Sequence, residues 1–214
     1  AESGFLPGGT GWYRKKFTLS EADSGKTVLI NFDGVYSDAY VYVNGTQVGE
    51  NHYGYNNFAF DITDYVTADG KTENVIAVKA VNNIPSSRWY SGSGIYRDVT
   101  LIVTDPVHVD WNGTKVTTPY IESGNGTVKT EVTVVNDGTA SVSATVTNTV
   151  YKKGSTSALA SADSEVTISA GSSKTVTNSP VVSSPALWDI DSPNPDLYTV
   201  VTTVTVNGEV VDEY

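Results

Sequence analysis

Short stretches in which apolar and polar residues alternate recur along the whole chain. Ala39, Val41 and Val43 fall at every second position, as do Val28 and Ile30. A two-residue period places successive side chains on opposite faces of the backbone, which is typical of half-buried β-strands. The runs expected to form strands are 12–19, 27–33, 36–44, 58–62, 75–81, 99–103, 128–135, 142–150, 200–206 and 209–214. The pattern predicts an all-β protein with almost no helix.

Turn signals separate these runs. Asn44-Gly45 and Asn207-Gly208 each lie between alternating segments, and Asn-Gly is the strongest short-range signal for a two-residue hairpin. In the second half, the stretches 124–126, 136–138 and 170–171 have the same role. Three Asn-Gly-Thr triplets, at Asn44, Asn112 and Asn125, match the glycosylation pattern, but we interpret all three as hairpin turns.

The composition changes near Asp105-Pro106. Nine of the 13 tyrosines and all five phenylalanines precede residue 106, whereas the second half alternates Val with Thr and Ser. About seven short strands with turn signals every 8–12 residues are typical of an immunoglobulin-like sandwich. We therefore expect two β domains, residues 1–105 and 106–214.

Charge and composition exclude several classes of function. The net charge is −11, and the longest run of basic residues is the triplet 14–16, which argues against nucleic acid or an anionic membrane as a partner. The chain has no cysteine and therefore no disulfide or thiol chemistry. No apolar run approaches the roughly 20 residues of a membrane-spanning helix. Because the sequence begins with Ala1 and contains no methionine, we expect a processed or cut fragment.

The connection 82–98 is too long for a simple hairpin between its flanking strands. Arg88, Trp89 and Tyr90 place a guanidinium group beside two aromatic rings. Rings pack on the C–H faces of sugars and a guanidinium group donates to hydroxyls, so these residues are candidates for sugar binding. The alternative is structural: the rings cover the end of a sandwich, and Arg97 pairs with a surface acid such as Asp98 or Asp33.

Three motifs resemble the N-terminal region of family 2 glycoside hydrolases, especially β-galactosidases. They are residues 87–97 (SRWYSGSGIYR), residues 11–17 (GWYRKKF) and residues 32–45 (FDGVYSDAYVYVNG). The resemblance implies a sugar-binding jelly-roll sandwich over residues 1–105. Residues 184–198 resemble the Leu-Trp…Pro…Leu-Tyr stretch of that family's immunoglobulin-like domain, in which we expect Trp188 to fill the sandwich core.

In that family, the two catalytic carboxylates lie in a (β/α)₈ barrel that follows the immunoglobulin-like domain, and this chain shows no alternating βα pattern. The resemblance therefore implies no catalytic residue here, whereas Arg88, Trp89 and Tyr90 contribute to substrate binding. His52 and His108 have no neighbouring cysteine, histidine or acid at ligand spacing, so we expect no metal site and no cofactor.

Two hypotheses follow. In the first, the chain is the non-catalytic N-terminal part of a bacterial, secreted or cell-surface β-galactosidase, with a cytoplasmic location left open. Its partners are then a β-galactoside-type sugar and the downstream (β/α)₈ domain. In the second, it is a self-standing carbohydrate-binding or adhesion module.

Overall fold

A computed structural model describes residues 8–83, 92–191 and 195–214. The chain divides into two compact units, residues 1–103 and 104–214. Apart from two 3₁₀ turns, at Glu21–Asp23 and Thr63–Tyr65, the regular elements of the described residues are β-strands, which confirms the all-β prediction. No helix in this part of the chain is long and apolar enough to cross a membrane.

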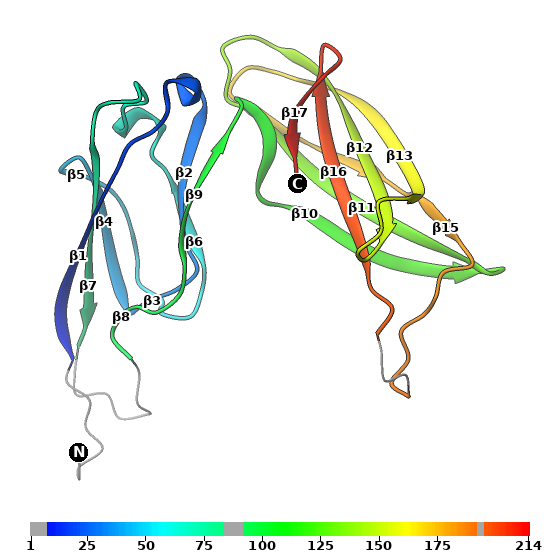
Figure 1. Cartoon of the computed structure of the whole chain (residues 1–214), viewed down its shortest axis with the longest axis horizontal. Coiled ribbons are helices and arrows are strands. Elements are labelled where there is room, and N and C mark those ends of the chain that lie inside the picture. Colours follow the sequence, from blue (N-terminus) through cyan, green and yellow to red (C-terminus); the bar gives the residue numbers. More distant parts are fainter. Residues whose placement is uncertain (1–7, 84–91, 192–194) are drawn as a thin grey trace. The chain divides into compact units, whose positions relative to one another are not determined.

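The first unit is a sandwich of antiparallel strands (Figure 1). One sheet has the strand order β1-β7-β4-β5, the other has the order β6-β2-β9, and β3 pairs with β8 at one end. The strands are β1 (Gly9–Phe17), β2 (Thr27–Phe32), β3 (Val35–Tyr36), β4 (Asp38–Val43), β5 (Thr46–Asn51), β6 (Phe58–Asp61), β7 (Asn74–Asn82), β8 (Gly94–Ile95) and β9 (Val99–Thr104).

Alternation along β4 builds the core of this unit. Ala39, Val41 and Val43 are fully buried, whereas the intervening Tyr40 and Tyr42 lie on the outer face of the sheet and are half-buried. From the opposite sheet, Phe32 and Phe58 stack with ring centroids 5.0 Å apart, while Ile30 and Ile62 complete the buried set. The face of β4 that carries Ala39, Val41 and Val43 is therefore the buried face.

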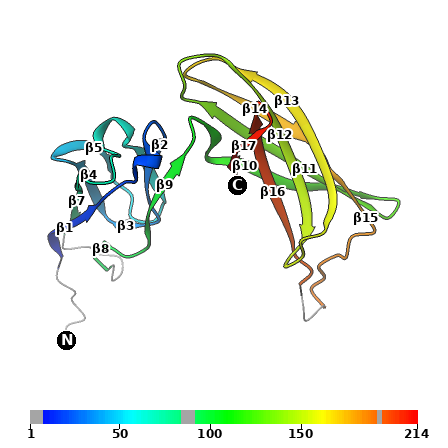
Figure 2. The ribbon, with the colours of Figure 1, turned by 45° about the horizontal axis from the view of Figure 1, so that its top comes forward.

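The second unit is a sandwich of longer strands, seen most clearly in Figure 2. Its sheets have the orders β10-β11-β14 and β13-β12-β16-β17, and β15 pairs with the first residues of β11. The strands are β10 (Val107–Glu122), β11 (Asn125–Asn136), β12 (Val142–Lys152), β13 (Ala158–Ile168), β14 (Ser172–Asn178), β15 (Val181–Ser183), β16 (Tyr198–Val206) and β17 (Glu209–Glu213).

A buried polar layer crosses the core of this second sandwich. Asn148 accepts a hydrogen bond from Thr130 (2.9 Å) and donates one to Thr202 (2.8 Å). Asn178 donates to the same Asn148 oxygen at 2.9 Å and to the carbonyl of Val146 at 2.9 Å. Because each of these groups has a partner, the layer avoids the free-energy cost of unpaired buried polar atoms and ties both sheets together.

The hairpins at Asn44-Gly45 and Asn207-Gly208 are present, with both residues of each pair at positive φ. The prediction of a turn at 124–126 was one residue off, because the positive-φ pair is Ser123-Gly124 and Asn125 already belongs to β11. The reading of Asn112 as a hairpin turn was wrong. It lies inside β10, where the pairing with β11 shifts register.

The expectation that Trp188 fills the second core was also wrong. Its side chain is 62% exposed, and the segment 184–191 lies outside the strands. The core positions are instead occupied by alternating valines of the strands, such as Val132, Val134, Val146 and Val204. These valines fill the sandwich on one side of the Asn148 layer, and the indole ring of Trp188 lies outside that core.

The polar layer generates a stability prediction. Replacement of Asn148 by alanine removes the shared partner of Thr130, Asn178 and Thr202 and leaves buried groups unpaired. We expect the unfolding free energy of the second unit to fall by about 3 kcal/mol. The matched control is Thr147→Ala, on the opposite face of the same strand, which should change the free energy little. Differential scanning calorimetry of both variants is the measurement, and equal effects would contradict the role of the layer.

Candidate functional site

The predicted site residues Arg88, Trp89 and Tyr90 lie outside the described residues, which resume at Gly92. The structure instead shows the residues on either side of this loop. Asn82, the last residue of β7, is buried, and its side-chain amide donates to the Ser93 hydroxyl at 2.7 Å. This bond joins the outgoing and returning sides of the loop.

Gly94 constrains the backbone on the C-terminal side of the loop. Its φ is +96°, a conformation that other residues rarely adopt, and a Cβ atom there would overlap the hydroxyl of Tyr13 on β1. The Tyr13 ring therefore lies directly against the backbone of the returning chain. Gly94 and Ile95 then pair with Tyr36 and Val35, so β8 is anchored on β3.

A second loop joins this end of the sandwich. The hydroxyl of Tyr96 donates to the carbonyl of Gly54 at 2.6 Å, and the same ring lies against Gly34. Residues near positions 34–36, 54 and 94–96 are thus held together although they are far apart in the sequence (Figure 1). We refer to this region as the loop end of the first unit.

Aromatic rings and amides gather at the loop end. Tyr36 and Tyr55 meet edge to face with centroids 5.4 Å apart, and Tyr53 meets Tyr55 at 5.9 Å. Tyr53 and Tyr55 are exposed. Beside them, the side-chain amides of Asn51 and Asn56 exchange two hydrogen bonds of 3.2 Å. Exposed rings with adjacent amide donors and acceptors suit a ligand that has both hydroxyl groups and C–H faces.

His52 lies between two carboxylates on the outer side of this region. Its Nδ1 is 3.2 Å from Asp38, and its Nε2 is 3.3 Å from Glu50. The hydrogen bond to Glu50, and to a smaller extent the one to Asp38, raises the pKa of His52 above its ordinary value. The two acids contact different ring nitrogens and do not converge on one point. Accordingly, the described residues contain no group of three or more His, Cys, Asp or Glu that could hold a metal ion.

The sequence reasoning missed these partners of His52. Asp38 and Glu50 are 14 and two residues away, but β4 and β5 pair across the Asn44-Gly45 turn. The hairpin signal could have identified them, because pairing from that turn brings Ala39 opposite Asn51 and so brings Asp38 near His52.

Arg97 contacts its neighbours at the edge of the loop end. Its guanidinium donates to the backbone carbonyl of Asp33 at 3.4 Å and lies 5.1 Å from the centre of the Tyr96 ring. We expected a contact to an acid such as Asp33 or Asp98. The contact to Asp33 is present but is made through its backbone.

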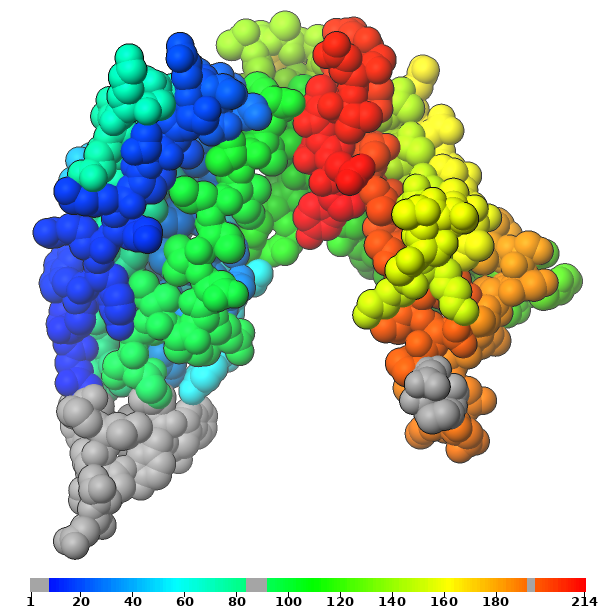
Figure 3. Space-filling view, in the orientation of Figure 1, coloured from blue at the N-terminus to red at the C-terminus, as the bar shows by residue number. Residues whose placement is uncertain are grey.

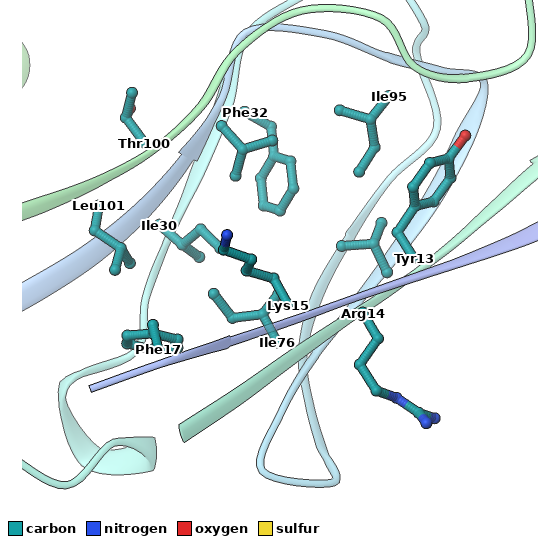
Figure 4. Close-up of a pocket in the computed structure, with 12 residues that line it drawn as sticks. Tyr13, Arg14, Lys15, Phe17, Ile30, Phe32, Ile76, Ile95, Thr100 and Leu101 are labelled. Atoms are coloured by element: carbon teal, nitrogen blue, oxygen red, sulfur yellow. The ribbon is translucent and has the colours of Figure 1, made fainter. Parts of the chain in front are cut away.

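The first unit also has an apolar opening between β1 and β9, with a volume of about 490 Å³ (Figure 4). Its walls are mainly core residues, including Ile30, Phe32 and Ile76, and Figure 4 shows the Lys15 side chain among them. An apolar lining of this kind offers little to sugar hydroxyls. The loop end is therefore the better candidate for carbohydrate recognition.

Comparison with protein families gives matches over nearly the whole chain. Residues 6–106 match the family described as "Glycosyl hydrolases family 2, sugar binding domain", and residues 107–214 match "Glycosyl hydrolases family 2". The boundary between these matches falls within three residues of the division between the two compact units.

Individual proteins agree with these matches. The chain is 42% identical over 212 residues to beta-galactosidase BoGH2A of Bacteroides ovatus and 37% identical over 219 residues to a putative beta-glucuronidase of Formosa agariphila. These alignments cover 99% and 98% of this chain, but only 24% and 19% of the relatives. A crystal structure of a glycosyl hydrolase family 2 member from Bacteroides cellulosilyticus superposes with a TM-score of 0.91 at 37% identity, covering 99% of this chain and 28% of that one.

The His52 contacts generate a prediction about pH. Because the pKa of His52 is raised, its ion pairs contribute stability that is fully present below its ordinary value of 6.5 and is lost as the pH rises through the folded-state pKa. We expect Glu50→Gln to lower this pKa toward 6.5, and Asp38→Asn to do so less. NMR titration of the imidazole protons of His52 measures both midpoints against that of the unmodified chain. An unchanged midpoint in Glu50→Gln would show that the contact carries no charge interaction.

Proposed function

Because the chain belongs to glycosyl hydrolase family 2, we propose that it is the non-catalytic N-terminal part of a retaining β-glycosidase. Its first domain would help to form the sugar-binding rim of the active site. The single observation that carries this proposal is the match to the N-terminal quarter of family members over both domains and in family order.

The chemistry of the loop end supports a role in recognition rather than bond cleavage. The acids that lie there, Asp38 and Glu50, are engaged with His52. Glycoside hydrolysis by a retaining mechanism needs two carboxyl groups about 5–5.5 Å apart that flank the scissile bond. Exposed tyrosines and asparagines, in contrast, bind a sugar without reacting with it. We therefore assign the catalytic pair to a downstream (β/α)₈ domain of the parent enzyme.

Within the rim, Arg88 is the residue to which we assign a contact with the sugar. A guanidinium group offers a fixed fork of donors, and Trp89 beside it can stack on that fork. Tyr90 would add a second aromatic surface. Asn82, Ser93 and Gly94 support this assignment, because they hold both sides of the loop at the loop end.

A β-galactoside is the substrate class that we favour. The relative with 42% identity carries the name beta-galactosidase, whereas the relative with 37% identity is named a putative beta-glucuronidase. The alternative is a β-glucuronidase, whose substrate has the opposite configuration at C4 and a carboxylate at C6. We further propose that the parent enzyme is secreted or held at the surface of a bacterium.

A stand-alone carbohydrate-binding or adhesion module is the second candidate, and the sugar-binding domain alone would fit it. The presence of the second family 2 domain favours the enzyme, since an isolated binding module needs no such addition. Sequencing of the parent reading frame distinguishes the two, because only the enzyme requires a downstream barrel with paired carboxylates.

The first prediction from this proposal concerns the 214-residue chain itself. Positioning residues cannot replace a missing general acid and nucleophile, so the purified chain should not hydrolyse a chromogenic β-galactoside. The measurement is release of the chromophore over buffer background, with the parent enzyme as the positive control. Turnover by the isolated chain that persists through repeated purification would show that catalytic groups lie within it.

The second prediction concerns Arg88 in the parent enzyme. We expect Arg88→Ala to lower kcat/KM for the β-galactoside at least tenfold, which corresponds to about 1.4 kcal/mol of transition-state binding. Steady-state kinetics provides the measurement, and an unchanged melting temperature shows that the fold is intact. The control is Arg14→Ala, which removes an exposed arginine from β1 and should leave kcat/KM unchanged. A wild-type value in Arg88→Ala would make the loop a purely structural element.

A further inference from the structure

An apolar groove opens at one end of the second domain. It has a volume of about 430 Å³ and lies where β10, β11, β12, β15 and β16 meet the segment 185–188. Its floor includes Val150 and Val182, which are buried. The polar layer lies between the groove and the main apolar core. Along β11, β12 and β16, the layer residues Thr130, Asn148 and Thr202 each stand between a core valine and a valine of the groove. The sandwich is therefore filled on one side of the layer and open on the other.

The rim of this groove exposes large apolar side chains. Leu187 and Trp188, which line the groove, are exposed, Trp188 to 62%, and Ile190 on the same segment is 86% exposed. Tyr120 and Ile121, from the β10–β11 hairpin, are also exposed. Soluble proteins rarely expose several large apolar residues together unless the surface serves an interaction. In Figure 3, the orange segment that carries residues 184–191 projects at this end of the second domain.

Hydrogen bonds fix the path of this segment although its side chains face solvent. The hydroxyl of Tyr198 donates to the carbonyl of Ala186 at 3.0 Å, and the backbone N–H of Ser184 donates to the carbonyl of Gly124 at 2.8 Å. Close by, Lys152 pairs with Asp196 at 2.9 Å. The apolar rim is thus presented by a positioned backbone, as expected of a preformed docking surface.

The composition of the groove indicates which kind of occupant it fits. Leucine, isoleucine and valine side chains predominate, and two polar groups beside them, the Asp196 carboxylate and the Tyr198 hydroxyl, already have partners within the domain. A sugar needs hydroxyl partners, whereas a protein surface needs apolar area. The occupant is therefore a protein.

We propose that this groove docks a further domain of the same polypeptide, which covers Trp188 and Ile190 and packs an apolar side chain over Val150 and Val182. The length of the relatives supports this occupant, since this chain spans only 24% of the Bacteroides ovatus protein and 28% of the Bacteroides cellulosilyticus structure. A covering domain within the same chain is present at a high effective concentration and needs no separate encounter. The inference rests on the proposed function, in which the parent carries a downstream domain.

Cysteine labelling tests the proposal directly, because the sequence contains no cysteine. Ile190→Cys and Leu187→Cys introduce single thiols at the rim, and Val210→Cys introduces one at a position that is 61% exposed on β17. The rate of reaction with a maleimide is measured in the 214-residue chain and in the parent polypeptide, whose other cysteines are replaced by serine. We expect at least tenfold slower labelling at positions 187 and 190 in the parent, and equal rates at position 210.

A second measurement does not depend on labelling. Trp188→Ala should leave the melting temperature of the second domain nearly unchanged in the 214-residue chain, because the side chain is exposed there, and should lower it in the parent, where the side chain is covered. Equal labelling rates at positions 187 and 190 in both proteins would overturn the proposal. Protection that appears in the isolated chain and rises with its concentration would assign the groove to a second copy, which also overturns it.

The design separates this inference from the proposed function. A parent that hydrolyses the β-galactoside but leaves positions 187 and 190 unprotected contradicts only the docking groove. A parent that protects both positions but hydrolyses no β-glycoside contradicts only the proposed activity.

Discussion

The inner face of each sheet must be buried by the opposite sheet, and both domains depend on this constraint. In the first domain, strand alternation alone meets it, with Val41 and Phe32 facing each other across an apolar core. In the second domain, part of the same space is taken by the hydrogen-bonded layer around Asn148. Such a layer is favourable only when every group is paired, so it specifies one alignment of β11, β12, β14 and β16. A slipped strand would leave several buried amides without partners.

The geometry of the loop end depends on this packing. Because β7, β8 and β1 are fixed by the core, Asn82, Gly94 and Tyr13 are fixed as well, and the loop between them leaves and returns at defined points. Ligand-recognition residues are often carried by loops on a rigid scaffold, since the scaffold limits the entropy lost when the loop binds. The chain thus combines a rigid sandwich with a loop whose two sides are joined.

Local pattern predicted many of the strands and the two Asn-Gly hairpins, because those features depend on neighbouring residues and on a period of two. It did not identify β10, β13 or β14 as strands. It did not predict the environment of Trp188 or the partners of His52. Whether Trp188 is buried depends on how much space the valines of both sheets leave, which no local window contains. The contacts of His52 depend on the pairing of β4 with β5. Arg88, Trp89 and Tyr90 were identified from their residue types and by resemblance, and their role stays a prediction.

The two domains differ in the chemistry of the surface that they expose, and this difference separates their roles. The first presents tyrosine rings beside paired asparagine amides, with Tyr53 and Asn51 as examples, and such a surface can exchange its hydrogen bonds with water for hydrogen bonds with a sugar. The second presents Ile190 and Trp188 around a floor of valines, a surface that gains free energy only when another apolar surface removes it from water. A ligand rich in hydroxyl groups suits the first surface and a protein suits the second. We therefore propose that recognition of sugar and attachment to the rest of an enzyme are divided between the two domains.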